Sequence, residues 1–314
     1  MGPLLAIAVA APVLAESQSS SPTSRALVAA QGAQTFGARV KPIGQTPRAA
    51  VEALEDQLGH PLPLVSEYPA WDANFPNPYF EWLANSGHQL LLAVKLKRAN
   101  GSRPSWAALA NATKGSVLYA ELHHWARAIR DLGAPTYFVF HKEPNEPANR
   151  PNGTAADYKA AWARVAQVFE HDGADNAQLV FAMAGGMYPS AGNTWYPGDK
   201  YVDVIAATGV NFRCSIESCT WREQEDIMRP MVTWSASHAG KTLGVVEGAT
   251  VEDPNHPFRK KRWIQNAQDY LTQLGTRVAF YSYWSSYDGL DYRLTSSDAA
   301  LKAGAAWASD PLWQ

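Results

Sequence analysis

TYFVFH, residues 136–141, is an apolar run of strand character, and the polar stretch KEPNEP, residues 142–147, follows it directly. A second run of the same kind, TLGVV at residues 242–246, leads into another polar position. A glutamate follows each run: Glu143 lies two residues after the first, and Glu247 lies directly after the second. Strands of a parallel barrel present their C-terminal ends at one rim, so the two carboxylates are predicted to meet there if both runs belong to one barrel.

Six further apolar runs of strand length bring the expected number to eight. They lie at residues 36–41, 62–66, 90–96, 178–183, 202–206 and 278–284. Because segments of helical period separate the runs, the pattern predicts an α/β fold, and a closed (β/α)8 TIM barrel in a single domain is the natural solution for eight strands. An open doubly wound sheet is the alternative, but a nucleotide-binding fold of that kind needs a glycine-rich phosphate loop after its first strand, and none follows residues 36–41.

The segments between the runs carry helix start signals and apolar faces. Thr46 followed by Pro47 is typical of a helix cap and a first helical residue. Thr154 with Asp157 three residues later is typical of a capping box, and apolar side chains spaced three and four apart follow it. A similar stripe runs through residues 263–274. We therefore expect the aromatic side chains of these segments to pack between the helices and the sheet.

The 314-residue chain is 46% hydrophobic and 18% charged, which is the composition of a folded protein with a large core. Its formal net charge is −2 and it has no Lys/Arg-rich run, so a nucleic-acid partner is not expected. Twelve tryptophans and thirteen tyrosines are a heavy aromatic load for this length. Some of these rings belong in the core, and others are candidates for binding the flat faces of sugars.

Residues 1–15 are predicted to be a signal peptide, because a short apolar stretch ends there in the small-residue cleavage site VLA. The stretch is too short to span a bilayer, so no membrane partner is expected. No Lys or Arg precedes it, which leaves open a start farther upstream, and a disordered apolar tail is the alternative. Residues 16–34, rich in serine, are predicted to be a flexible linker. In a secreted, extracellular protein, Cys214 and Cys219 are expected to form a local disulfide rather than a metal site.

Four stretches carry a likeness to a known family. They are HKEP at residues 141–144, DYKAAWARV at 157–165, WYPGDKYVDVI at 195–205, and Tyr283-Trp284 ahead of DYRL at 291–294. In these stretches the chain resembles glycoside hydrolase family 26. The YPGD block is the most distinctive of the shared features, and the likeness extends over most of the chain from about Phe36 onward.

The resemblance implies a secreted enzyme that hydrolyses internal β-1,4 bonds of a mannan-type polysaccharide with retention of configuration. Relatives in that family cut mixed-linked glucans or xylans, so these polymers are the alternative substrates. Residues 35–314 would form the catalytic barrel, with Glu143 as acid/base and Glu247 as nucleophile. No metal or cofactor is implied, and we expect a monomer whose partner is a polysaccharide or oligosaccharide.

The chemistry explains why two carboxyl groups are needed. One must keep its proton and donate it to the glycosidic oxygen, and the other must be ionised to attack the anomeric carbon. Retaining enzymes place the two groups about 5 Å apart. A negative charge on Glu247 at that distance would raise the pKa of Glu143 and keep its proton in place.

The chain departs from the family next to the first glutamate. Many members have histidine directly before the acid/base, whereas this chain has Lys142 there and His141 one residue earlier. Because strand side chains alternate, we expect His141 and Glu143 to share a face and Lys142 to point away. Glu146 is the alternative acid/base, since in other families of the same clan the acid/base glutamate lies in an Asn-Glu-Pro motif.

A second departure lies after the sixth run. The family usually has a tyrosine there that hydrogen-bonds the nucleophile, but this chain has Val210. Tyr281, Tyr283 or another group is expected to replace it. If none does, the alternative is a catalytically impaired barrel that binds carbohydrate.

Further residues are predicted to bind substrate because they end strands or lie in loops at the same rim. They are His141, Trp284, Trp71, Trp195 and Asn211. Trp284, at the end of the eighth run, is the favoured sugar platform, although a tryptophan packed on the barrel rim is the alternative. For His141, a buried histidine of the barrel interior is an equal alternative.

Overall fold

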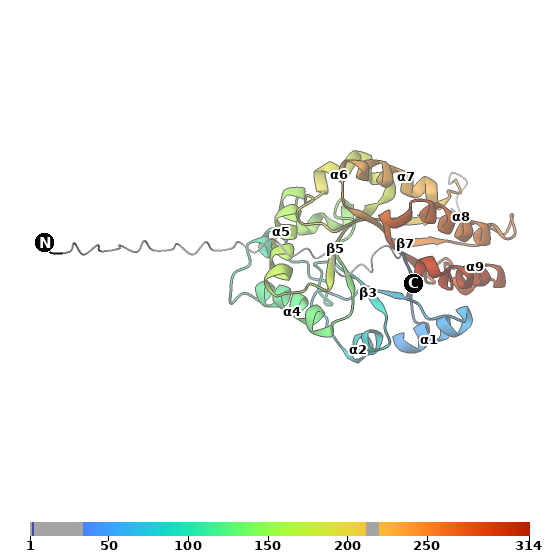
Figure 1. The fold of residues 1–314 in the computed structure, drawn as a ribbon, viewed down its shortest axis with the longest axis horizontal. Helices are drawn as coiled ribbons and strands as arrows, with labels where there is room; N and C mark the ends of the chain where they lie inside the picture. The colour runs from blue at the N-terminus through green and yellow to red at the C-terminus, as the bar shows by residue number, and fades with distance from the viewer. Residues whose placement is uncertain (1, 3–33, 212–219) are drawn as a thin grey trace.

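The computed structural model describes Gly2 and residues 34–211 and 220–314. Eight parallel strands close into a barrel in sequence order, with β8 pairing to β1 (Figure 1). The strands are β1 (Thr35–Val40), β2 (Leu64–Glu67), β3 (Gln89–Val94), β4 (Thr136–Phe140), β5 (Ala177–Ala184), β6 (Val204–Asn211), β7 (Thr242–Thr250) and β8 (Val278–Ser285). The predicted (β/α)8 TIM barrel is confirmed, and each of the eight expected runs contributes a strand.

Helices surround the barrel (Figure 1). The α-helices are α1 (Pro47–Leu58), α2 (Pro78–Asn85), α3 (Trp106–Ala110), α4 (Val117–Leu132), α5 (Ala155–His171), α6 (Tyr188–Trp195), α7 (Gln224–Trp234), α8 (Arg259–Gln273) and α9 (Asp298–Ala308). The short 3-10 helices are η2 (Pro147–Asn152), η3 (Gly185–Met187), η4 (Ser235–Ser237), η5 (Gly275–Arg277), η6 (Leu294–Ser296) and η7 (Pro311–Trp313).

The predicted helix caps are confirmed. The Thr46 side chain accepts a hydrogen bond from the backbone N–H of Ala49, 3.2 Å away, and Pro47 is the first residue of α1. At the start of α5, Thr154 and Asp157 each accept a hydrogen bond from the backbone of the other. These caps satisfy N–H groups that have no partner within the helix, and so they fix where each helix begins.

Buried apolar side chains form two groups. The larger lies between strands and helices and includes Phe36, Trp162 and Trp307. The smaller fills the barrel interior, where the rings of Tyr137 and Phe280 lie 4.4 Å apart. Because the interior is packed with side chains, the chemistry of such a barrel takes place at the ends of its strands.

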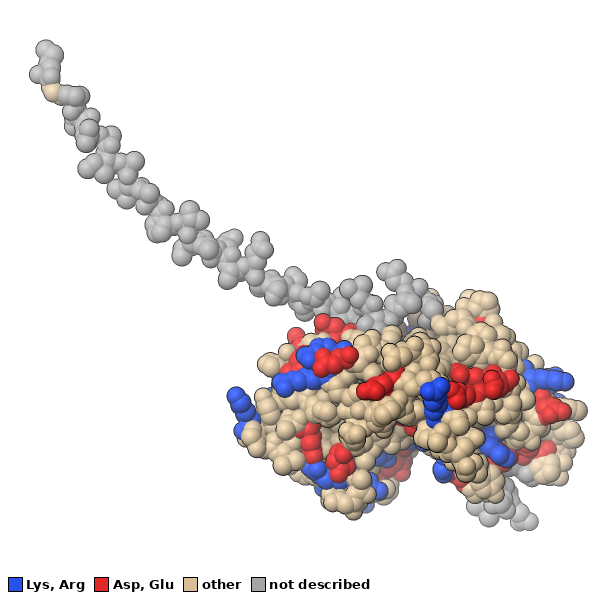
Figure 2. All heavy atoms as spheres, turned by 90° about the horizontal axis from the view of Figure 1, so that it is seen from below, with Lys and Arg blue, Asp and Glu red and all other residues tan. Residues whose placement is uncertain are grey.

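The predicted leader and linker fall within residues 1–34, of which the structure describes only Gly2 and Gln34, and both cysteines of the expected disulfide lie outside the described residues. Among the described helices, none is long and apolar enough to cross a membrane. On the face drawn in Figure 2, basic and acidic side chains are interspersed, in keeping with a formal net charge of −2.

Candidate active site

Glu247 owes its position to an irregularity in β7. The register between β6 and β7 skips Val246, so that Thr208 lies opposite Glu247 and β7 carries one extra residue. Val245 packs in the outer core and Val246 inside the barrel, so simple alternation would turn Glu247 outward against the helices. The bulge breaks the alternation, and Glu247 instead contacts Lys142 at the C-terminal end of the barrel.

The backbone that follows β4 is also unusual. His141 has φ of 49° and Glu143 has φ of 55°, in the left-handed region that side chains with a Cβ atom rarely adopt. The N–H of His141 donates to the Val94 carbonyl at 2.9 Å, and the N–H of Glu143 donates to the Ala182 carbonyl at 2.7 Å. These bonds tie the segment to β3 and β5, and strain of about 1–3 kcal/mol per residue is typical of functional sites.

The Glu143 carboxylate has two defined contacts. Thr208 Oγ1 donates to Oε1 at 2.6 Å, and Lys142 Nζ lies 3.5 Å from Oε2. The Asn149 side chain donates to the Glu143 backbone carbonyl at 2.7 Å and so holds the main chain in place. Burial raises the pKa of the Glu143 carboxyl, but the charge of Lys142 and the Thr208 hydrogen bond outweigh burial, so the pKa lies below its ordinary value.

Lys142 points into the site, and its ammonium lies between the two glutamates. Nζ is 2.5 Å from Glu247 Oε1 and 3.5 Å from Glu143 Oε2. The expectation that Lys142 points away is wrong, because β4 ends at Phe140 and the left-handed backbone after it does not alternate. The two glutamate oxygens are therefore at most 6.0 Å apart, which is the sum of their distances to Nζ.

Tyr68, which follows β2, lies beside Glu247, and its buried hydroxyl makes no hydrogen bond with the described residues. It is therefore the candidate for the hydroxyl that Val210 lacks, although it does not hydrogen-bond the carboxylate in this structure. Burial raises the pKa of the Tyr68 phenol well above its ordinary value, and the negative charge of Glu247 raises it further. Tyr281 and Tyr283, the expected replacements, are buried and donate instead to a glutamine side chain of α7 and a carbonyl of β7. No motif marks Tyr68 beyond its place after an apolar run.

Trp284 packs against this group, edge to face with Tyr68 at a ring separation of 5.2 Å. The Tyr68 ring also lies 5.6 Å from both the Arg39 guanidinium and the Lys142 ammonium. Arg39 is in turn paired with Glu67. Trp284 is half-buried, and the structure places it, of the three predicted tryptophans, beside the side chains that surround the carboxylates.

His141 has no exposed surface. Its Nδ1 accepts hydrogen bonds from the Leu96 backbone N–H at 3.0 Å and the Trp106 indole N–H at 3.1 Å. Burial, with a contribution from the charge of Lys95, lowers the pKa of His141 to about 3, so the ring is neutral. It therefore fixes the loops after β3 and β4, and it has no surface with which to contact a sugar.

The remaining predicted residues make other contacts. Trp71 is 1% exposed and donates its indole N–H to Glu121 at 2.9 Å. Trp195 is half-buried against aromatic rings of α3 and α5. Asn211 is 2% exposed and donates to a threonine of β7 at 2.9 Å. Glu146 directly precedes η2, whereas Glu143 and the glutamate of β7 both contact Lys142.

No family model matches the sequence, and a search of curated proteins finds no similar one. Among solved structures, the catalytic domain of an endo-β-1,4-mannanase of glycoside hydrolase family 26 from Bacillus sp. JAMB-750 superposes with a TM-score of 0.63 at 15% identity, covering 90% of this chain and 87% of that one. A family 26 β-mannanase from Bacteroides ovatus gives 0.62 at 13%, covering 91% of each chain. A modular endo-β-1,4-mannanase from Cellulomonas fimi gives 0.61 at 16%, covering 90% of this chain and 72% of that one. The chain has the fold of these mannanases. The resemblance carried by the sequence motifs is thus confirmed at the level of the fold.

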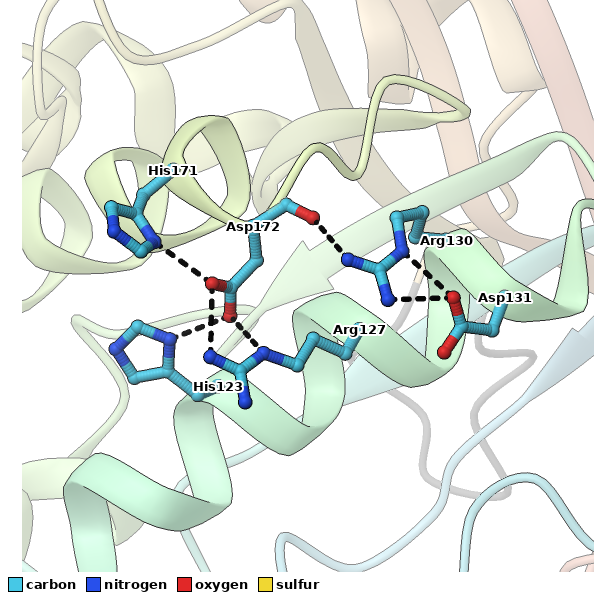
Figure 3. Close-up of polar contacts among 6 residues, drawn as sticks. All are labelled: His123, Arg127, Arg130, Asp131, His171 and Asp172. Carbon is cyan, nitrogen blue, oxygen red and sulfur yellow. Dashed lines mark hydrogen bonds and ion pairs between the residues drawn. The ribbon is translucent and has the colours of Figure 1, made fainter.

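A second cluster of titratable groups lies in the helical layer between α4 and α5. Figure 3 shows the Asp172 carboxylate with His123, Arg127 and His171 around it. The imidazole Nδ1 atoms of His123 and His171 lie 2.5 and 2.8 Å from its two oxygens. Two imidazoles and a carboxylate are donors suited to zinc, but the Arg127 guanidinium, at 3.1 Å, already pairs with the same carboxylate. The cluster is therefore an ion-pair network that joins the two helices.

Asp172→Asn is expected to lower the free energy of unfolding by about 2 kcal/mol, because a buried carboxylate that holds two helices together loses its charge. The pKa of Asp172 is lowered: burial raises it, but hydrogen bonds from His171, His123 and Arg127 outweigh burial. Its stabilisation is therefore present above the ordinary aspartate pKa and is lost as pH falls through the lowered value, so wild type and variant should converge in acid. Urea unfolding at neutral and acid pH measures both effects, and Asp131→Asn, an exposed neighbour, is the matched control. Equal stability of Asp172→Asn and wild type at neutral pH would contradict the assignment.

Proposed function

We propose that the protein is a secreted, monomeric, retaining glycoside hydrolase that cuts internal β-1,4 bonds of a mannan-type polysaccharide. The observation that carries the proposal is the placement of Glu143 and Glu247 after β4 and within β7, with carboxylate oxygens at most 6.0 Å apart through Lys142. Retaining enzymes separate these groups by about 5–5.5 Å, whereas inverting enzymes need about 6.5–9.5 Å to admit a water molecule. The separation therefore favours double displacement.

In the first step Glu143 gives its proton to the glycosidic oxygen while Glu247 attacks the anomeric carbon, which yields a glycosyl ester and a free sugar chain end. Thr208 donates to Oε1 of Glu143, so Oε2 is the oxygen that carries the proton. In the second step the Glu143 carboxylate takes a proton from water, the water oxygen attacks the anomeric carbon, and Glu247 leaves as a carboxylate. Two inversions return the original configuration.

Lys142 sets the conditions under which this cycle runs. Its ammonium neutralises the charge that would otherwise hold a proton on Glu143, so the acid form of Glu143 is favoured only in acid or after substrate has drawn Lys142 away from the pair. A sugar hydroxyl is an acceptor that the ammonium could bind in exchange. We expect the protein to be most active under acid conditions.

Lys142→Met is expected to move the basic limb of the kcat/KM profile to higher pH. Glu143 donates a proton only while protonated, and that fraction falls as pH rises through its pKa. Burial raises the pKa of Glu143 and Lys142 lowers it, so removing the ammonium leaves the acid protonated to a higher pH. The measurement is kcat/KM against pH on a polysaccharide, at constant ionic strength. Lys97→Met, at an exposed position nearby, should leave the profile unchanged; a basic limb that stays put in Lys142→Met rules out the tuning role.

A carbohydrate-binding barrel with impaired turnover is the second candidate, and the contact of Lys142 with both carboxylates favours it. An activated 2-fluoro glycosyl fluoride separates the two. A catalyst releases one equivalent of fluoride in a burst, and mass spectrometry of a digest then finds the sugar on Glu247. A binder releases no fluoride.

Galactomannan, glucomannan, lichenan and xylan, compared by product sizing, then distinguish mannan from mixed-linked glucan or xylan as substrate.

A further inference from the structure

Two basic side chains at the C-terminal end of the barrel take no part in the ion pairs described above. Lys95 directly follows β3, and it shares a strand face with Ala93, which lines the barrel interior. Its ammonium lies close enough to Lys142, Glu143 and Glu247 to be affected by their charges, which places it at the end of the barrel where the two glutamates meet. Arg103 lies farther along the same loop, between β3 and α3, where its guanidinium approaches the Asn152 side chain at 3.4 Å.

The other cations of the site are matched by carboxylates. Arg39 pairs with Glu67, and Lys142 pairs with both catalytic candidates. Lys95, in contrast, makes no side-chain hydrogen bond or ion pair with any residue in the described part of the chain. In that same part, the one side-chain hydrogen bond or ion pair that Arg103 makes is with the neutral amide of Asn152. Among residues 34–211 and 220–314, these two positive charges thus have no negative partner.

These unmatched charges act on each other. Burial lowers the pKa of the Lys95 ammonium, and the charges of Lys142 and Arg103 lower it further. Glu143 and Glu247 act in the opposite direction, but one of them must be protonated for acid catalysis, which removes half of that compensation. During the reaction, the charged groups named here therefore have an excess of positive charge. Gathering such charges costs free energy, and a bound anion would offset that cost.

We propose that the polysaccharide bound here is anionic, with a carboxylate-bearing sugar beside the bond that is cut, and that Lys95 and Arg103 bind this carboxylate. The inference rests on the proposed glycosidase function and names its substrate class. Guanidinium presents paired N–H donors that match the two oxygens of a carboxylate, and a nearby ammonium adds a point charge without a fixed direction. A neutral sugar hydroxyl needs neither a paired donor nor a positive charge to bind.

Two pairs of polymers test the proposal, each pair differing only in its carboxyl groups. One pair is glucomannan and the same glucomannan partly oxidised at C6. The other is glucuronoxylan and its carboxyl-reduced form. Binding is measured by affinity electrophoresis, and hydrolysis by new reducing ends. The acidic member of at least one pair is expected to bind about 10- to 100-fold more tightly, the range of a hydrogen bond to a charged group.

That preference should disappear in Lys95→Met and Arg103→Met. It should persist in the matched controls Lys97→Met and Arg150→Met, which remove exposed charges from the loops after β3 and β4. Thermal unfolding of each variant verifies that it is folded. Equal or tighter binding of the neutral members, or a preference that survives in the Lys95→Met/Arg103→Met double variant, overturns the proposal. A Lys95-dependent preference without cleavage of any polymer would support the anionic ligand and refute the glycosidase function, so the two can fail separately.

Discussion

Glu247→Ala is expected to lower kcat on polysaccharide and on aryl glycosides alike, by at least about 10⁴-fold. The nucleophile forms the bond to the anomeric carbon in the first step, so no leaving group can compensate for its loss. Glu247 lies opposite Thr208 in the β6–β7 pair, and this backbone pairing does not depend on the carboxylate, so the variant should keep the fold of the site. The measurement is steady-state kinetics with both substrate types.

Added azide provides the positive control for Glu247→Ala. The small anion can enter the space left by the carboxylate and attack the anomeric carbon directly, which gives a glycosyl azide of inverted configuration. Nuclear magnetic resonance of the product reports that configuration. A variant that keeps a tenth or more of wild-type activity, about 1.4 kcal/mol in activation free energy, would show that Glu247 is not the nucleophile.

Glu143→Ala is expected to slow the cleavage of polysaccharide much more than the cleavage of aryl glycosides with acidic leaving groups. Hydrolysis of polysaccharide should fall by about 10²–10⁴-fold, because its leaving oxygen needs a proton. Aryl glycosides with acidic leaving groups need no proton to depart, so formation of the glycosyl ester should change little. The ester should then accumulate, because Glu143 is also the base that activates water, and burst kinetics with a dinitrophenyl glycoside measures this.

Glu146→Ala is the matched control for Glu143→Ala, since Glu146 is the alternative acid/base on the same loop. It directly precedes η2, and its backbone carbonyl accepts the N–H of Asn149, so removing its side chain leaves that turn in place. Wild-type kinetics on both substrate types is the expected result. A leaving-group dependence that appears in Glu146→Ala and not in Glu143→Ala would exchange their roles.

The fold followed from signals that are local along the chain. Each strand is a short apolar run. The two helices with predicted caps begin directly after Thr46 and Thr154, whose side chains accept a backbone N–H of the first helical turn. The ends of β6 and β7 were set differently. Both run past their expected ends, Ala206 and Val246, because the two strands pair with each other as far as Asn211 and Thr250. Pairing partners of this kind are distant in sequence, so an apolar run alone cannot define them.

Within the site, the two glutamates could be located from their strands, but the direction of Lys142 could not. Alternation of side chains assumes an extended backbone. The positive φ angles of His141 and Glu143 are held by backbone hydrogen bonds to β3 and β5, which are distant in sequence. The same assumption put His141 beside Glu143, whereas it is buried with Trp106. Tyr68 was missed because it comes from a strand whose end carried no motif.

The extra residue in β7 has a consequence for how such a protein can change over time. Val246 has no partner in β6, so its loss would restore regular pairing, with Glu247 still opposite Thr208 and still turned inward after the outward-facing Val245. The barrel interior would lose the packed side chain of Val246. Lineages that drop this codon would be expected to keep the glutamate in place and to become less stable.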